Sequence, residues 1–150
     1  MLDTIYKYID YKNTTFNEIV DLRYNILFEP YGKIKKYKYD ELDKYSYHLV
    51  ALIDNKVIGY SRLSLIDSRV LTGKISNVVV YPDYNKNGIG HNMLKVHIKK
   101  AYELNIKYLF LHARKDTVDF YKKVGFISKG SVFTSDMSGL LLQKMYLEVK

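Results

Sequence analysis

The sequence predicts an α/β fold of the α+β type, in which helices pack on a mixed β-sheet. Short strand-like apolar runs recur along the chain, and three of them follow one another closely, as in an antiparallel meander. Runs with a helical period separate the others, in the order β, α, three strands, α, β, α, β, β. The 150 residues, 47% of them hydrophobic, suit a single domain over 1–150 with a buried core.

The first elements are a strand and a helix. Residues 4–9 (TIYKYI) have the composition of a strand. Residues 14–27 (TTFNEIVDLRYNIL) carry apolar side chains at helical spacing, and Thr15 and Glu18 have the spacing of a capping box. Residues 31–46 are charged and rich in tyrosine, and we expect a loop with a short helical turn there.

Three strands are predicted in the middle of the chain. Residues 48–53 (HLVALI) and 56–66 (KVIGYSRLSLI) flank Asp54 and Asn55, a pair that favours a tight hairpin turn. Residues 70–81 (VLTGKISNVVVY) form the next predicted strand. These three strands constitute the expected meander.

The C-terminal half alternates helices and strands. We expect a helix from about residue 89 to 105 and a buried strand over 108–113. Asp116 is the expected N-cap of a short helix, and Gly125 stands where that helix would end in a left-handed residue. The closing strands are expected at 126–128 and 140–149.

The chain is basic, with a formal net charge of +8. A basic surface suits nucleic acid or another polyanion, such as a small polyphosphorylated ligand. The sequence shows neither a helix-turn-helix pattern nor the aromatic pattern of RNA-binding sheets, so we do not expect nucleic acid as a partner. A general bias toward lysine in the composition explains the charge equally well.

Composition also restricts the location of the protein. The absence of cysteine excludes disulfides and cysteine metal sites, and we expect no metal. No apolar run approaches the roughly 20 residues that a membrane span needs, and the first residues do not resemble a signal peptide. We therefore expect a cytoplasmic protein with no membrane partner.

Two glycines, Gly88 and Gly90, lie where the long helix begins. Glycine permits close approach and a positive φ, and a helix N-terminus offers unpaired N–H groups to an anion such as phosphate. Asn85, Lys86 and Asn87 add polar and cationic groups beside them. The alternative is a tight strand-to-helix turn with no ligand. Both standard phosphate-binding glycine motifs are missing, so a nucleotide-type ligand would require another fold.

Two segments resemble the signatures of the GNAT N-acetyltransferase superfamily. Residues 78–94 (VVVYPDYNKNGIGHNML) are similar to its strand, loop and glycine-rich helix start, and residues 111–126 contain the second motif, FYKKVGF. The resemblance implies a GNAT-type mixed, mostly antiparallel sheet of about six to seven strands flanked by helices. Asn85 stands where the family usually has Arg or Gln, and we expect weaker cofactor binding as a result.

The resemblance also implies acetyl-CoA as cosubstrate and an amine of a small molecule or protein as acceptor, in a monomer or homodimer. The pyrophosphate would lie at residues 85–91, and the pantetheine arm would run along residues 78–80. The residues implied to bind the cofactor are Val78, Val79, Val80, Asn85, Lys86, Asn87, Gly88, Ile89, Gly90, His91, Phe120 and Lys123.

Acetyl transfer to an amine needs a donor for the carbonyl oxygen and a donor for the departing thiolate. The resemblance assigns these roles to the Val80 N–H and to the Tyr121 hydroxyl. A tyrosine, with an ordinary pKa of about 10, keeps its proton at pH 7. Tyr121 could instead be one half-buried aromatic among the 16 tyrosines.

The base that accepts the amine proton is less clearly indicated. Many members of the family have a glutamate on the central strand, where this chain has Asn77 and no carboxylate. The candidates are Glu29, His48 and His112, with water as an alternative relay. The residues expected to contact the acceptor are Arg62, Asn77 and His112.

A second interpretation keeps the fold without the chemistry. A non-catalytic CoA-binding or sensing domain is compatible with Asn77 and Asn85, which replace a carboxylate and a longer side chain. Turnover measured by release of free thiol separates the two interpretations.

Overall fold

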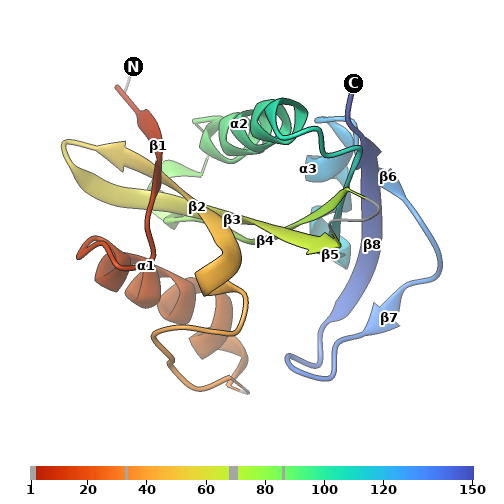
Figure 1. The fold of residues 1–150 in the computed structure, drawn as a ribbon. Helices are drawn as coiled ribbons and strands as arrows, with labels where there is room; N and C mark the ends of the chain where they lie inside the picture. Colours follow the sequence, from red (N-terminus) through yellow and green to blue (C-terminus); the bar gives the residue numbers. More distant parts are fainter. Residues whose placement is uncertain (1–2, 33, 68–70, 86) are drawn as a thin grey trace.

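The computed structural model describes residues 3–32, 34–67, 71–85 and 87–150 (Figure 1). A single sheet runs through the described part of the chain, in the order β1-β2-β3-β4-β5-β8-β6, and β7 pairs with β8. The β4–β5 pair is parallel and the other pairs are antiparallel. The mixed, mostly antiparallel sheet is confirmed, with one additional short strand, β7, that the sequence did not predict.

The elements agree closely with the predicted order. The strands are β1 (Ile5–Ile9), β2 (Ser46–Ile53), β3 (Lys56–Asp67), β4 (Thr72–Val80), β5 (Tyr108–Arg114), β6 (Ile127–Ser128), β7 (Phe133–Thr134) and β8 (Leu141–Glu148). The helices are α1 (Phe16–Leu22), α2 (Ile89–Glu103) and α3 (Val118–Lys122). Short helical turns are η1 (Arg23–Phe28), η2 (Glu29–Tyr31), η3 (Asp43–Tyr45), η4 (Pro82–Tyr84) and η5 (Lys115–Thr117).

Of the two predicted helix caps, Thr15 is at the N-cap position of α1 but does not form a capping box, and Asp116 is not the N-cap of α3. Thr15 has helical backbone angles and makes no side-chain cap bond, while the Asn13 side chain accepts the Thr15 N–H at 2.9 Å. Asp116 lies inside η5 and does not cap α3, which begins after Thr117. The Thr117 hydroxyl instead donates to the Arg114 carbonyl at 2.7 Å. The spacing of capping residues indicated where each helix would begin, but not which side chain would accept a hydrogen bond from the N–H groups of its first turn.

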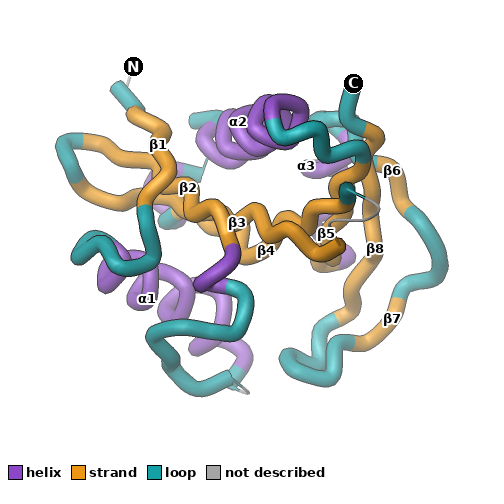
Figure 2. Tube along the Cα trace, in the orientation of Figure 1, coloured by secondary structure: helices purple, strands orange, loops and turns teal. Residues whose placement is uncertain are grey.

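The two faces of the sheet carry separate helices, as Figures 1 and 2 show. On one face, Met93, Leu94 and Ala101 of α2 are fully buried against the strands. On the other face, Phe16 and Ile19 of α1 are buried in the same way. Burying a large apolar side chain contributes about 1.5–3 kcal/mol, so both helices stabilise the sheet between them. None of the described helices combines the length and apolar character needed to cross a membrane.

Local backbone geometry fixes the central hairpin. Asp54 and Asn55 have φ of 50° and 62°, as the two-residue turn between β2 and β3 requires. The resulting register places His48 opposite Arg62 and Val50 opposite Tyr60. The hairpin that the sequence predicts is therefore confirmed.

The sheet opens between β4 and β5. Their parallel pairing extends only from Thr72↔Tyr108 to Lys74↔Phe110. Further along β4, the register with β3 shifts, and Asn77 adopts a φ of 54° at this bulge. Residues 75–80 consequently have β3 on one side and, among the described residues, no strand on the other.

Candidate active site

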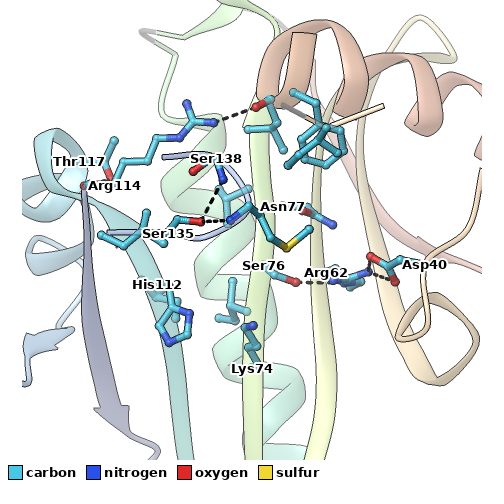
Figure 3. A pocket seen from close by; sticks show the side chains of 18 of the residues that line it. Asp40, Arg62, Lys74, Ser76, Asn77, His112, Arg114, Thr117, Ser135 and Ser138 are labelled. Atoms are coloured by element: carbon cyan, nitrogen blue, oxygen red, sulfur yellow. Dashed lines mark hydrogen bonds and ion pairs between the residues drawn. The ribbon is translucent and has the colours of Figure 1, made fainter. Parts of the chain in front are cut away.

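A cavity of about 360 Å³ lies where β4 and β5 separate (Figure 3). Its walls come from β3, β4 and β5, from η1 and the loop after η2, from η5 and α3, and from the segment that leads into β8. Its ionisable lining residues are Tyr37, Asp40, Arg62, Lys74, His112, Arg114 and Tyr121. The described residues contain no cluster of three or more His, Asp or Glu side chains suited to a metal ion.

Strand alternation places several polar side chains of β4 and β5 on one face of each strand. Side chains two residues apart lie on the same face of a strand, so Lys74 and Ser76 share one face of β4, and His112 and Arg114 share one face of β5. Ile75, between Lys74 and Ser76, and Ala113, between His112 and Arg114, are buried in the apolar core. This alternation, which lies in the segments KISNV and LHAR, is the signal that could have revealed Lys74, Ser76 and Arg114 from the sequence.

A buried ionic network closes one side of the cavity. Arg62 Nη1 lies 2.6 Å from Asp40 Oδ2 and 2.9 Å from Asp43 Oδ1, and Arg23 Nη1 lies 3.0 Å from the same Asp43 oxygen. Arg62 Nε also donates to Ser76 Oγ at 3.0 Å. Arg62 lines the cavity, and its guanidinium is bound to these partners.

Burial and charge act in opposite directions on Asp40. Burial raises the pKa of this carboxyl, whereas the hydrogen bond and charge of Arg62 lower it, and the net effect is a pKa below the ordinary value. Asp40 is therefore ionised at neutral pH. The positive charges of Arg23 and Arg62 then balance the negative charges of Asp40 and Asp43. Neither Asp40 nor Asp43 was singled out in the sequence, because their partners are distant along the chain.

His48 belongs to this network and does not line the cavity. Its Nε2 donates to the Asp43 carbonyl at 2.7 Å, and its Nδ1 accepts from the Tyr60 hydroxyl at 2.6 Å. Burial lowers its pKa, so the ring is neutral, with both nitrogens engaged. This environment favours a structural role, and we do not assign the base to His48.

The other two candidates for the base lie in different settings. Glu29 is exposed in η2 and is not among the lining residues. His112 lines the cavity and is exposed. Burial, followed by the charges of Lys74 and Lys144, lowers the pKa of His112.

Tyr121 lines the cavity from α3. Its ring packs edge-on against Phe120 and Phe126, with centroids 5.0 Å and 6.1 Å away. Burial raises the pKa of Tyr121 to about 12, against a smaller lowering by Arg114. The hydroxyl therefore stays protonated at pH 7, as a donor must.

Asn77 and Val78 line the cavity beside the β4 bulge. The Asn77 Nδ2 is buried without a hydrogen-bond partner among the described residues, and so it can donate to a ligand. Val79 is buried on the α1 side of the sheet, and Val80 is partly buried. The structure thus brings Arg62, Asn77, Val78, His112 and Tyr121 to one cavity.

The glycine-rich turn lies beyond the other end of the open β4 edge. Gly88 has a φ of 72° and precedes α2, and a Cβ there would meet nothing within 4 Å. Asn85 and Asn87 are exposed beside it, and Lys86 lies outside the described residues. This region is open to a ligand at a helix start.

The glycine at position 90 makes room for a side chain of this protein, and not for an anion as expected. A Cβ on Gly90 would lie 2.7 Å from Phe120 Cζ, so the glycine makes room for this ring. His91 stacks on the same ring at a centroid distance of 4.4 Å, and its Nε2 lies 3.1 Å from the Phe120 carbonyl oxygen. Ile89 is buried in the core, while Lys123 is exposed. Gly90, His91 and Phe120 therefore dock α3 on the start of α2.

Replacing Gly90 with alanine should lower the free energy of unfolding by about 1–3 kcal/mol, because the added methyl overpacks against Phe120. Thermal unfolding measures this loss. Phe120→Leu, combined with Gly90→Ala, removes the clashing ring atoms, so the double variant should lose less stability than the two single losses added together. Strictly additive losses would show that the two side chains do not share this contact.

The profile of the acetyltransferase (GNAT) family matches residues 14–126. The chain belongs to the GNAT acetyltransferase family. It is 30% identical over 92 residues to the glucosamine 6-phosphate N-acetyltransferase of Schizosaccharomyces pombe, covering 57% of this chain and 83% of that protein. It is 31% identical over 74 residues to the uncharacterized N-acetyltransferase ycf52 of Pyropia yezoensis, covering 49% of this chain but only 41% of that protein.

Solved structures of this family have the same fold. Escherichia coli ElaA superposes with a TM-score of 0.81 at 18% identity, with 99% of this chain and 100% of that chain covered. An aminoglycoside 6'-N-acetyltransferase complexed with coenzyme A superposes with a TM-score of 0.75 at 14% identity, with 97% of each chain covered. At these identities the likeness shows the fold alone.

Proposed function

We propose that this chain transfers an acetyl group from acetyl-CoA to an amine of a small molecule or protein, by direct attack in a ternary complex. The observation that carries the proposal is the open edge of β4. It runs from the Gly88 turn to a cavity that contains Tyr121. We keep the expectation of a cytoplasmic location.

The helix start suits the pyrophosphate of acetyl-CoA. The first N–H groups of α2 have no partner inside the helix, and the helix dipole favours an anion there. The open space at Gly88 leaves these groups accessible. The pantetheine arm, which carries amide groups, can pair with the backbone groups of residues 75–80 that point away from β3.

The Val80 N–H is suited to the carbonyl oxygen of the thioester. The Tyr81 N–H donates to the Ile58 carbonyl of β3 at 2.9 Å. Successive N–H groups of a strand point in opposite directions, so the Val80 N–H points away from β3, toward the open edge. We assign to it the stabilisation of negative charge on that oxygen.

Tyr121 is assigned to the departing sulfur. A thiol has an ordinary pKa of about 8.5, so complete proton transfer from a buried phenol would be unfavourable. We infer that Tyr121 donates a hydrogen bond while charge develops on the sulfur. We propose that water at the exposed side of the cavity takes the proton from the amine. We treat His112 as a residue that contacts the amine substrate.

The first test is a thermal shift with acetyl-CoA, desulfo-CoA and ATP. A ligand at about 100 times its Kd stabilises a protein by roughly 2.7 kcal/mol, or about 5–10 °C for a domain of this size. We expect a shift with both CoA compounds and little with ATP. No shift at millimolar acetyl-CoA would overturn the proposal. Binding without turnover of any amine would favour the non-catalytic alternative.

A further inference from the structure

The cavity carries positive charge that its own carboxylates do not balance. Arg62 occupies both oxygens of Asp40, with Nη1 at 2.7 Å and 2.6 Å, and Asp43 is shared with Arg23. Lys74 and Arg114 also line the cavity, and neither has a carboxylate partner among the described residues. Arg114 is directed to the Tyr31 hydroxyl and the Leu27 carbonyl, at 2.8 Å and 3.2 Å.

Lys74 and His112 share one end of the cavity (Figure 3). Lys74 pairs with Phe110, which lies two residues before His112 on the same face of β5, and His112 pairs with Lys144 of β8. Two lysines and a histidine thus lie on one face of three adjacent strands. Burial and then Arg62 lower the pKa of Lys74 despite Asp40, and burial, Lys74 and Lys144 lower that of His112.

Such an arrangement is unfavourable without a counter-charge. Like charges on neighbouring side chains repel one another, and an anion placed among them would relieve the repulsion. Asp40 is the carboxylate among the described lining residues, and Arg62 already neutralises it. An anionic group on the ligand would supply this counter-charge.

We propose, on the basis of the acetyltransferase function above, that the acceptor is an amine that also carries a carboxylate or phosphate group. Lys74 and His112 hold this anionic group at one end of the cavity. The amine then lies toward Val78 and Tyr121, where the open β4 edge would present the thioester.

The strand sets the length of such an acceptor. Lys74 precedes Val78 by four positions on β4, and a strand rises about 3.3 Å per residue, less where a bulge interrupts it. The amine and the anionic group should therefore be separated by roughly 10 Å. An extended chain of several bonds, or a sugar ring with a phosphate arm, spans such a distance.

Matched pairs of amines test the proposal. One series pairs 4-aminobutyrate, 6-aminohexanoate and 8-aminooctanoate with alkylamines of the same chain length, and another pairs glucosamine 6-phosphate with glucosamine. We expect kcat/KM to be about tenfold or more higher for the anionic member of the preferred pair, since a hydrogen bond to a charged group is lost in its neutral partner. The two series distinguish a carboxylate from a phosphate.

Lys74→Met should remove most of this preference, because the ammonium group binds the anionic member of each pair and not its neutral partner. Lys56→Met, an exposed lysine at the β2–β3 hairpin, is the matched control and should leave the preference unchanged. Equal or better turnover of the neutral amines would overturn the proposal. So would a preference that survives in Lys74→Met.

A binding measurement tests the proposed anion site even if no amine in either series is acetylated. NMR titration of the His112 ring, with CoA present, should show its pKa rising when 6-acetamidohexanoate, 8-acetamidooctanoate or N-acetylglucosamine 6-phosphate is added. N-hexylacetamide should leave the pKa unchanged. An unchanged pKa with all three anions would overturn the anion site. Failure of the acetyltransferase function itself is separate, because it appears as the absence of a thermal shift with acetyl-CoA.

Discussion

Tyr121→Phe is expected to lower kcat about 100-fold, with little change in the thermal shift that acetyl-CoA produces. Loss of one donor to a developing charge typically costs between 10² and 10³ in kcat. The phenylalanine ring keeps the contacts with Phe120 and Phe126, so the fold should remain intact. Steady-state release of CoA from acetyl-CoA, with an amine found in the matched series, measures the effect.

The pH profile gives this prediction a second readout. Burial raises the pKa of Tyr121 to about 12, so its proton is present throughout the working range. The variant should therefore have a uniformly lower rate between pH 6 and 9, with an unchanged profile shape. Tyr102→Phe is the control, since Tyr102 is 64% exposed on α2. A Tyr121 variant within twofold of the wild-type kcat would remove the residue from the mechanism.

Local patterns predicted the framework of the fold well. The β2–β3 hairpin follows from Asp54 and Asn55, which tolerate the positive φ of a two-residue turn, and the long helix follows from apolar residues at helical spacing. Turn residues and the spacing of apolar residues are local properties of the chain, so a single sequence is enough to recognise them. The two-residue strands β6 and β7 are too short to show a period, and β7 was missed.

The site was predicted only in part, because its chemistry depends on distant contacts. The sequence alone suggested His48 and Arg62 as functional groups. In the structure His48 is hydrogen-bonded to Tyr60 and Asp43, and Arg62 is hydrogen-bonded to Asp40. Those partners come from another loop or strand, and no periodicity encodes the pairing. Gly90 was expected to make room for an anion, whereas its neighbour is Phe120, 30 positions later in the chain.

Asp43→Ala is expected to lower the free energy of unfolding by about 3–5 kcal/mol, the usual result of removing one partner from a buried ion pair. The Asp43 carboxylate is fully buried and accepts from Arg23 Nη1, Arg62 Nη1 and the Asp40 N–H. Without it, two buried guanidinium groups would have Asp40 as their remaining carboxylate in the network. For a domain of this size the melting temperature should fall by about 10 °C or more.

Asp21→Ala supplies the matched control for the loss of an ion pair. Asp21 lies 2.6 Å from Lys36 Nζ, a distance shorter than those made by Asp43, but both side chains are about half exposed. An exposed pair contributes about 0–1 kcal/mol, because water and salt screen it. The two variants therefore separate burial from distance as the source of stability. Similar losses in both, measured by denaturant unfolding, would mean that the Arg23–Asp43–Arg62 network does not hold the loop of residues 31–46 on the sheet.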